Sequence, residues 1–225
     1  MELTILMPCL NEAPTVSGCV REAIAYLESR QIVGEVLIAD NGSVDSSREL
    51  AAAAGARVVT VSEKGYGNAI RGGILASKGR YVIIGDCDGS YDFSGLDSIF
   101  EKLRQGYQLV VGNRFSGGIA PGAMPFSHRY LGVPLLSWLG RHRFHVEVSD
   151  FHCGLRGVSR EAALVTKLQT GGMEFSTEII GRFAEAGLSI CQVPVPLLKD
   201  QRQGPGHLRT IPDGIRHLRL ILFWK

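Results

Sequence analysis

The sequence lacks the features that mark a membrane-spanning, exported or disulfide-bonded protein. No stretch approaches the roughly 18 apolar residues that a spanning helix needs. The amino terminus, MELTILMPCLNE, has no basic region followed by a long apolar one, as a secretory signal would. The five cysteines are odd in number, widely scattered and without a C-x-x-C pair, which is typical of reduced thiols. These absences predict a soluble, cytoplasmic protein.

Glycine-rich nucleotide-binding patterns are also missing. A dinucleotide-binding fold needs G-x-G-x-x-G directly after its first strand, but here the first apolar run continues into PCLNEAPT. The near match Gly65-x-Gly67 has Ile70 where the last glycine should be. The G-x-x-x-x-G-K-[ST] phosphate loop is absent as well. Dehydrogenases, methyltransferases and sugar nucleotidyltransferases, which usually begin with a glycine-rich loop, are therefore disfavoured.

Strand and helix signals alternate through the first half of the chain. Apolar runs predict strands at residues 3–7, 35–39, 57–61, 80–85 and 108–112. Helices are expected at residues 15–30, 45–54, within 66–77 and at 96–104. Short apolar strands between amphipathic helices indicate an α/β fold, in which a mainly parallel, Rossmann-like sheet is flanked by helices on both faces.

The second half is less regular. The sequence predicts a glycine- and proline-rich loop at 115–125, an amphipathic segment at 126–144 and a compact turn at 150–157. A helix at 174–186, a strand at 189–195 and a basic amphipathic end at 200–225 are expected to follow. Neither a repeat nor a linker interrupts the 225 residues. We therefore expect one domain, in which residues 1–113 and 114–225 form two functional halves.

Charge divides along the same boundary. Residues 1–113 carry 10 Lys/Arg against 14 Asp/Glu, a net charge of −4, whereas residues 114–225 carry 14 against 8, a net charge of +6. Four arginines and no acid lie between Arg114 and Val146. This stretch is either a solvated basic face or a surface for an anionic partner.

Polar clusters follow three of the predicted strands, at the edge where ligands bind in open α/β sheets. They are PCLNE at 8–12, DNGS at 40–43 and DCD at 86–88. Asp86 and Asp88 could reach one Mg²⁺ or Mn²⁺ ion, which takes one or two carboxylates beside phosphates and waters. The alternative is an ordinary acidic turn, because Asp-Gly-Ser is common turn chemistry.

Taken in order, MPCLNE, ADNGSVDSS, KGYGNAIRGG and GDCDGSYDF resemble the nucleotide-sugar half of family-two inverting glycosyltransferases with the GT-A fold. GNRF at 112–115, HRYLG at 128–132, DFHCGLRG at 150–157 and MEFSTEII at 173–180 extend the likeness over nearly the whole chain. The resemblance is strongest to the polyprenyl-phosphate (dolichol-phosphate) mannosyl- and glucosyltransferase group.

This resemblance implies a hexosyltransferase with a UDP- or GDP-sugar donor and a Mg²⁺ or Mn²⁺ ion. It assigns the metal to Asp86 and Asp88. It assigns the donor's base, ribose and diphosphate to Pro8, Leu10, Asn11, Glu12, Asp40, Ser43, Lys64, Gly65, Gly67, Asp86 and Cys87. For Asn11 and Glu12, capping of the following helix is an alternative role.

On the acceptor side, the resemblance implies that an anionic acceptor's phosphate is held by Arg114, Arg129, Arg202, His207 and Arg209. Guanidinium suits phosphate because its planar fork can bond two oxygens at once. Arg114, Asp88 and Asp150 are the expected catalytic residues. A hydroxyl acceptor would need a base, for which Asp150 is preferred over Glu174 and Glu178.

Two departures from the group's pattern bear on the substrate. Gly89-Ser90 follow the D-x-D, and the loop at Arg202–Arg209 differs from the usual R-x-x-G-x-S-K. Polyprenyl phosphate is the preferred acceptor, and a soluble sugar, glycerate or polysaccharide end is the alternative. The carboxy-terminal helix, with Ile215, Leu218, Ile221 and Leu222, either lies at the inner face of a membrane or packs on the body. We expect no nucleic-acid partner.

Overall fold

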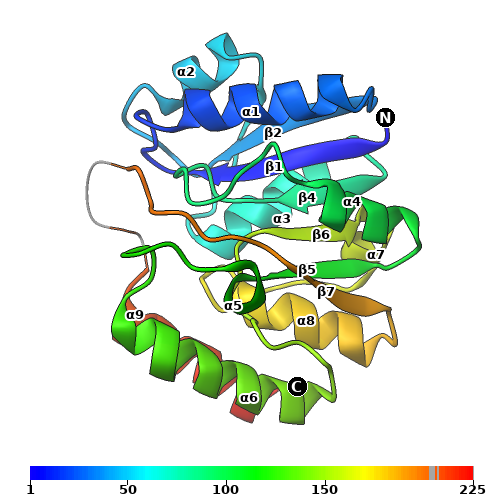
Figure 1. The fold of residues 1–225 in the computed structure, drawn as a ribbon, viewed down its shortest axis with the longest axis vertical. Helices are drawn as coiled ribbons and strands as arrows, with labels where there is room; N and C mark the ends of the chain where they lie inside the picture. Colours follow the sequence, from blue (N-terminus) through cyan, green and yellow to red (C-terminus); the bar gives the residue numbers. More distant parts are fainter. Residues whose placement is uncertain (203–205, 207, 225) are drawn as a thin grey trace.

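The computed structural model describes residues 1–202, 206 and 208–224. Within these residues, seven strands form one sheet in the order β3-β2-β1-β4-β6-β5-β7 (Figure 1). The strands are β1 (Leu3–Cys9), β2 (Gly34–Asp40), β3 (Arg57–Thr60), β4 (Tyr81–Ile84), β5 (Leu109–Asn113), β6 (Arg156–Ser159) and β7 (Ile190–Pro194). The helices are α1 (Val16–Ser29), α2 (Ser47–Ala53), α3 (Tyr66–Ala76), α4 (Asp97–Arg104), α5 (Arg114–Gly117), the π-helical turn η1 (His128–Gly132), α6 (Val133–Phe144), α7 (Arg160–Val165), α8 (Phe175–Glu185) and α9 (Thr210–Leu222).

The expected mainly parallel sheet is confirmed. The β1–β2, β1–β4, β2–β3 and β5–β7 pairs are parallel. Strand β6 lies between β4 and β5 and runs antiparallel to both. Since β6 comes from the second half of the chain and β4 from the first, both halves contribute to one sheet.

The prediction of a compact turn through residue 157 was wrong at its end, because β6 begins at Arg156. An arginine in a central strand is unusual, since burying a charge is costly unless its polar atoms are bonded. Here the buried Arg156 guanidinium donates to the carbonyls of Cys153 and Ser176. Cys153 belongs to the preceding turn, but Ser176 lies on α8, 20 residues further along the chain, so the local sequence could not indicate this second acceptor.

Helices cover both faces of the sheet, as expected. In Figure 1, α1 and α4 lie in front of the sheet and α3 lies behind it. Arg30, directly after α1, pairs with Asp97 of α4 at 2.6 Å, and α3 contacts α7 and α8 on the other side. Helices α6 and α9 contact each other and α8, and form an outer layer at one end of the molecule.

The carboxy-terminal helix α9 packs on the body, which was one of the two alternatives, and also keeps an exposed apolar face. Asp213, His217 and Ile221 face the body, while Ile215 and Leu222 are exposed. Ile221 therefore does not belong to the exposed apolar face on which the sequence had placed it. No helix in the described part of the chain is both long and apolar enough to cross a bilayer.

Candidate active site

A cavity of about 840 Å³ opens at the carboxyl ends of the parallel strands. Strands β1 and β2 end side by side, with Cys9 paired to Asp40, and β4 ends on the other side of β1. The sheet forms one side of the cavity, and η1, α6 and α9 form the other. Segments from both halves of the chain thus enclose one space.

Three carboxylates gather at the sheet side of this cavity around one guanidinium. Arg202 forms an ion pair with Asp88, lies 3.3 Å from Glu12 Oε1, and lies 2.6 Å from an oxygen of Asp200. Burial raises the pKa of Glu12 to about 7; Arg202 opposes this rise and Asp88 adds to it. The cluster therefore favours a cation among its oxygens, and Arg202 supplies one.

Asp86 lies beside this cluster, between the Tyr66 hydroxyl and the backbone of Gly154. Burial and the neighbouring Asp88 raise its pKa to about 6, although a hydrogen bond from Tyr66 opposes the rise. Gly154 approaches so closely that a Cβ there would lie 2.2 Å from Asp86 Oδ2. Any side chain at position 154 would displace the carboxylate.

The turn after the D-x-D explains one departure from the group's pattern. Asp88 Oδ1 accepts a hydrogen bond from the Ser90 amide at 2.9 Å. Between them Gly89 has a φ of +79°, a conformation that glycine adopts without steric cost. Glycine at this position shapes the turn that aims Asp88 into the cavity.

These residues fit a divalent metal ion by their chemistry. Mg²⁺ and Mn²⁺ prefer oxygen ligands, and the Arg202 guanidinium already marks the place as one that takes positive charge. Among the residues that the structure describes, no three His, Cys, Asp or Glu side chains are arranged as a complete metal site. Mg²⁺ commonly takes only one or two carboxylates and completes its shell with phosphates and water. Asp86 and Asp88 are the residues that would hold it.

The expected donor and metal ligands divide into two groups. Those that line the cavity are Pro8, Leu10, Glu12, Lys64, Gly65, Asp86, Cys87 and Asp88. Asn11, Asp40, Ser43 and Gly67 do not line it. Gly67 instead packs against the loop at 170–171, where a Cβ would lie 2.3 Å from the Thr170 carbonyl oxygen.

Asp40, Ser43 and Asn11 hold the loops beneath the cavity. The buried Asp40 carboxylate accepts hydrogen bonds from the amides of Gly42 and Ser43, at 3.1 and 3.2 Å. Ser43 Oγ accepts from the Asn11 amide at 2.9 Å, and Asn11 Oδ1 accepts from the Val44 amide at 2.9 Å. Their hydrogen bonds set the loop positions and leave Asn41, not Asp40, on the cavity wall.

Arg114 and Asp150 form a tight buried pair. Asn113 caps α5 by accepting hydrogen bonds from the amides of Phe115 and Ser116, which places Arg114 in the first turn. Arg114 Nε and Nη2 donate to the two Asp150 oxygens at 2.7 and 2.8 Å, and its amide donates to Asp150 Oδ2 at 3.1 Å. Asp150 is fully buried and does not line the cavity, whereas Arg114 does. This geometry suits Asp150 to positioning Arg114 rather than to acting as a base.

The other acceptor-side candidates are only partly brought together. Arg202 and Arg209 line the cavity. Arg129 does not, and its guanidinium lies over the Tyr130 ring, 5.5 Å from the centroid. His207 lies outside the described residues. Glu178 does not line the cavity; its carboxylate accepts from the amides of Gln169 and Thr170, at 2.9 and 2.8 Å, and Glu174 does not line it either.

His128 is a cavity residue that sequence reasoning missed. It precedes Arg129 in the motif HRYLG, and the π-helical turn η1 directs the histidine, not the arginine, inward. Its Nε2 lies 3.0 Å from Thr210 Oγ1, which joins η1 to the start of α9. Burial and the nearby Arg114 lower the pKa of His128. The motif was visible in the sequence, but the inward-facing residue depended on the helix geometry.

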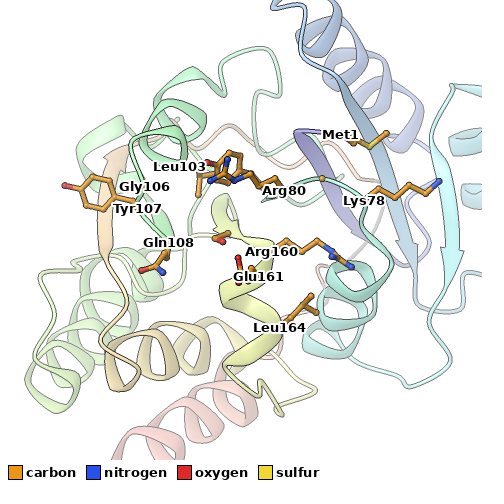
Figure 2. A pocket seen from close by; sticks show the side chains of 13 residues that line it. Met1, Lys78, Arg80, Leu103, Gly106, Tyr107, Gln108, Arg160, Glu161 and Leu164 are labelled. Atoms are coloured by element: carbon orange, nitrogen blue, oxygen red, sulfur yellow. The ribbon is translucent and has the colours of Figure 1, made fainter.

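A second cavity, of about 580 Å³, lies at the amino ends of the parallel strands, opposite the first cavity (Figure 2). Lys78, Arg80, Arg160 and Glu161 are among the residues that line it, and none of the expected site residues does so. Because ligands of open α/β sheets bind beyond the carboxyl ends of the strands, the first cavity is the candidate active site.

Comparisons with known proteins relate the chain to one family. The model of Glycosyl transferase family 2 matches residues 4–164. The low-salt glycan biosynthesis hexosyltransferase Agl6 of Haloferax volcanii is 37% identical over 221 residues, which is 98% of this chain. The chain spans only about half, 53%, of that relative's length.

Two further proteins add to the comparison. The dolichyl-phosphate hexose transferase of Haloferax volcanii is 29% identical over 196 residues, covering 87% of this chain and 82% of that protein. Glucosyl-3-phosphoglycerate synthase from Mycobacterium tuberculosis, solved with Mn²⁺, UDP and glucosyl-3-phosphoglycerate, has a TM-score of 0.72 at 24% identity, covering 98% of this chain and 77% of that one. The structural likeness confirms the GT-A type of α/β fold.

Proposed function

Because this chain belongs to glycosyl transferase family 2 and is a glycosyltransferase, we propose that it moves a hexose from a UDP- or GDP-sugar to an anionic acceptor. The preferred acceptor is polyprenyl phosphate, and the transfer inverts the configuration at the anomeric carbon of the sugar. One relative is named for dolichyl-phosphate, which supports this choice. Asp86 and Asp88 hold Mg²⁺ or Mn²⁺, the latter being present beside UDP in the structural neighbour.

The observation that carries the proposal is the opposite charge at the two sides of one cavity. Glu12, Asp86 and Asp88 supply the acidic side, where a cation and a nucleotide diphosphate would bind together. Arg114 and Arg209 supply the basic side, beside His128. A donor and an anionic acceptor can thus meet between them.

The metal ion, when bound, would act as a Lewis acid and offset the charge on the departing diphosphate. The protein's own residues prepare the acceptor side. Asp150 engages Nε and Nη2 of Arg114 and so holds the guanidinium in one orientation, in which a phosphate would contact its Nη1–Nη2 end. A phosphate oxygen is already ionised near neutral pH, so it needs little help from a base. This agrees with an Asp150 that is engaged by Arg114.

The test is nucleotide release by purified protein with Mn²⁺ or Mg²⁺ and a panel of UDP- and GDP-sugars, with and without a short-chain polyprenyl phosphate. We expect the protein to release either UDP or GDP, and we expect the lipid phosphate to increase the rate of that release. Asp88→Ala should lower turnover at least about a hundredfold, in the range that losing a charge-stabilising group costs. Asp92→Ala is the matched control, since Asp92 lies in the same loop but is exposed.

Each outcome distinguishes the substrates. Release stimulated by 3-phosphoglycerate or a soluble sugar, but not by the lipid phosphate, would replace the preferred acceptor by the alternative one. The phosphoglycerate named for the structural neighbour makes it the first soluble acceptor to try. If Asp88→Ala turns over like the unaltered protein, the assignment of the metal site is wrong.

A further inference from the structure

Large exposed hydrophobic side chains gather on one part of the surface, formed by η1, α6, α9 and the residues next to them. Four of the five exposed aromatic side chains in the described part of the chain lie there. We call this surface the α6–α9 platform, and define it by Phe126, Tyr130, Leu131, Leu135, Trp138, Ile211, Ile215, Leu222 and Phe223. Single exposed apolar residues are normal, but a patch of this kind marks an interaction surface.

Helix α6 turns an apolar stripe away from the protein. Its buried residues are Ser137 and Gly140, and a Cβ at Gly140 would lie 2.6 Å from the Phe151 ring. Leu131, Leu135 and Trp138 follow one another at spacings of four and three residues, so they share the outward face, where they are 48–65% exposed.

Helix α9 presents a second stripe of the same kind. Ile211, Ile215 and Leu222 are 44–73% exposed, opposite the buried face of the helix. Both α6 and α9 rest on α8, and Figure 1 shows them together at one end of the molecule. Their faces away from α8 therefore point to the same side. With 12 and 13 residues, each helix offers a stripe about 18–20 Å long.

The exposed charged side chains of α6 and α9 have one sign. Arg143, Arg216 and Arg219 are exposed on these two helices. The acid of α9, the buried Asp213, lies 3.5 Å from Arg216 and also accepts a hydrogen bond from the Arg209 amide at 2.7 Å. It therefore offsets Arg216, and the positive charge at the edge of the platform comes from Arg143 and Arg219. Aliphatic and aromatic side chains edged by arginines are the composition of helices that lie in the interface of an anionic bilayer.

We propose that the α6–α9 platform docks this enzyme on the surface of a bilayer that contains anionic lipids. This inference deepens the proposed function and rests on it for its purpose. The inward sides of the same helices wall the cavity, with Val133 and Leu136 from α6 and Gly214 from α9. A phosphate carried by a membrane lipid would then reach Arg114 from the surface on which the enzyme lies.

The test is flotation of the purified protein with vesicles of phosphatidylcholine, with or without phosphatidylglycerol, and without any prenyl phosphate. We expect binding to the anionic vesicles only. Replacing both Leu135 and Trp138 by Ser should weaken it at least about tenfold, because each loses buried apolar area. Arg143→Gln and Arg219→Gln should each weaken vesicle binding about fivefold. This difference from the unaltered protein should vanish at about 1 M salt, which screens the attraction to anionic lipids.

Leu75→Ser is the matched control, since Leu75 on α3 is 65% exposed, like Leu131, but lies away from the platform. Its vesicle binding should equal that of the unaltered protein. Equal binding by the Leu135/Trp138 variant, or by neutral and anionic vesicles, would overturn the inference. So would a concentration-dependent dimer in light scattering that Leu135→Ser dissolves, since the platform would then be a contact between two copies.

The experiment also separates this inference from the proposed function. The platform variants should transfer sugar normally to a short, water-soluble prenyl phosphate, because their side chains lie outside the cavity. Vesicle binding without transfer to any prenyl phosphate would leave the platform in place and remove the proposed acceptor. Transfer to a soluble prenyl phosphate without vesicle binding would do the reverse.

Discussion

The ion pair between Arg114 and Asp150 allows the two candidate roles of Asp150 to be separated. Asp150→Asn keeps the shape of the side chain but removes its charge and one of two strong acceptors. The pair is buried, with Arg114 11% and Asp150 0% exposed, and three hydrogen bonds from Arg114 end on the carboxylate. Removing one partner of a buried pair leaves an uncompensated charge, which costs about 3–5 kcal/mol.

We expect the free energy of unfolding to fall by about 3 kcal/mol, at the lower end of that range because asparagine can still accept one bond. For a chain of this length the midpoint of thermal unfolding should drop by about 6–12 °C. Glu2→Gln is the control. Glu2 has the same two-point geometry with Arg104, at 2.8 and 2.9 Å, but the pair is exposed. Its loss should cost less than about 1 kcal/mol.

Kinetics provide the second readout. If Asp150 positions Arg114, the variant should raise KM for the phosphate acceptor at least about tenfold, since a hydrogen bond to a charged group contributes about 1.5–3 kcal/mol. The shape of the pH profile of kcat should stay the same. The reasoning is refuted if stability is unchanged while kcat falls several hundredfold and its acidic limb disappears, because that pattern identifies a base.

Three further predictions follow from other contacts. Gly154→Ala should abolish Mn²⁺-dependent nucleotide binding in calorimetry, since its Cβ would lie 2.2 Å from Asp86 Oδ2; Gly18→Ala, with nothing within 4 Å, should bind normally. Arg202→Met should tighten binding of Mn²⁺ alone about tenfold, measured by electron paramagnetic resonance, because the carboxylates lose a competing cation that contributes about 1.5–3 kcal/mol; unchanged affinity would show that the guanidinium does not compete. Burial lowers the pKa of His217 to about 4. As the pH falls, the unfolded chain therefore takes up a proton at this histidine near pH 6.5, whereas the folded protein takes it up only near pH 4. The free energy of unfolding should fall by about 3 kcal/mol between pH 6.5 and pH 4. In urea titrations at several pH values, His217→Gln should remove this contribution to the pH dependence of the free energy of unfolding.

Much of the fold and of the donor side could be predicted from the sequence, because both depend on local patterns. Apolar runs of strand length alternate with amphipathic helices, and parallel strands bring their carboxyl ends to one edge. Asp86 and Asp88 follow β4 directly, so their place beside the end of β1 depends only on strand order. The ordered motifs likewise indicated the glycosyltransferase family before any contact was known.

Other features depended on contacts between segments far apart in the chain. Strand β6 begins with Arg156, whose buried guanidinium donates to the carbonyl of Ser176, 20 residues away on α8, as well as to that of nearby Cys153. Asp150 stands 36 residues from Arg114, and only the fold turns a candidate base into a partner for that guanidinium. In η1, the helical phase selects His128 over Arg129 for the cavity.

The sequence by itself determined the α/β class, the family and the acids at the strand ends, since each follows from spacing along the chain and from the periodicity of strands and helices. Tertiary structure alone decided which charges neutralise one another and which remain for a ligand. Electrostatic pairing depends on distance in space and on burial, and neither can be read from the order of residues. The same reason explains the platform, whose two apolar stripes come from α6 and α9 and meet only because both helices rest on α8.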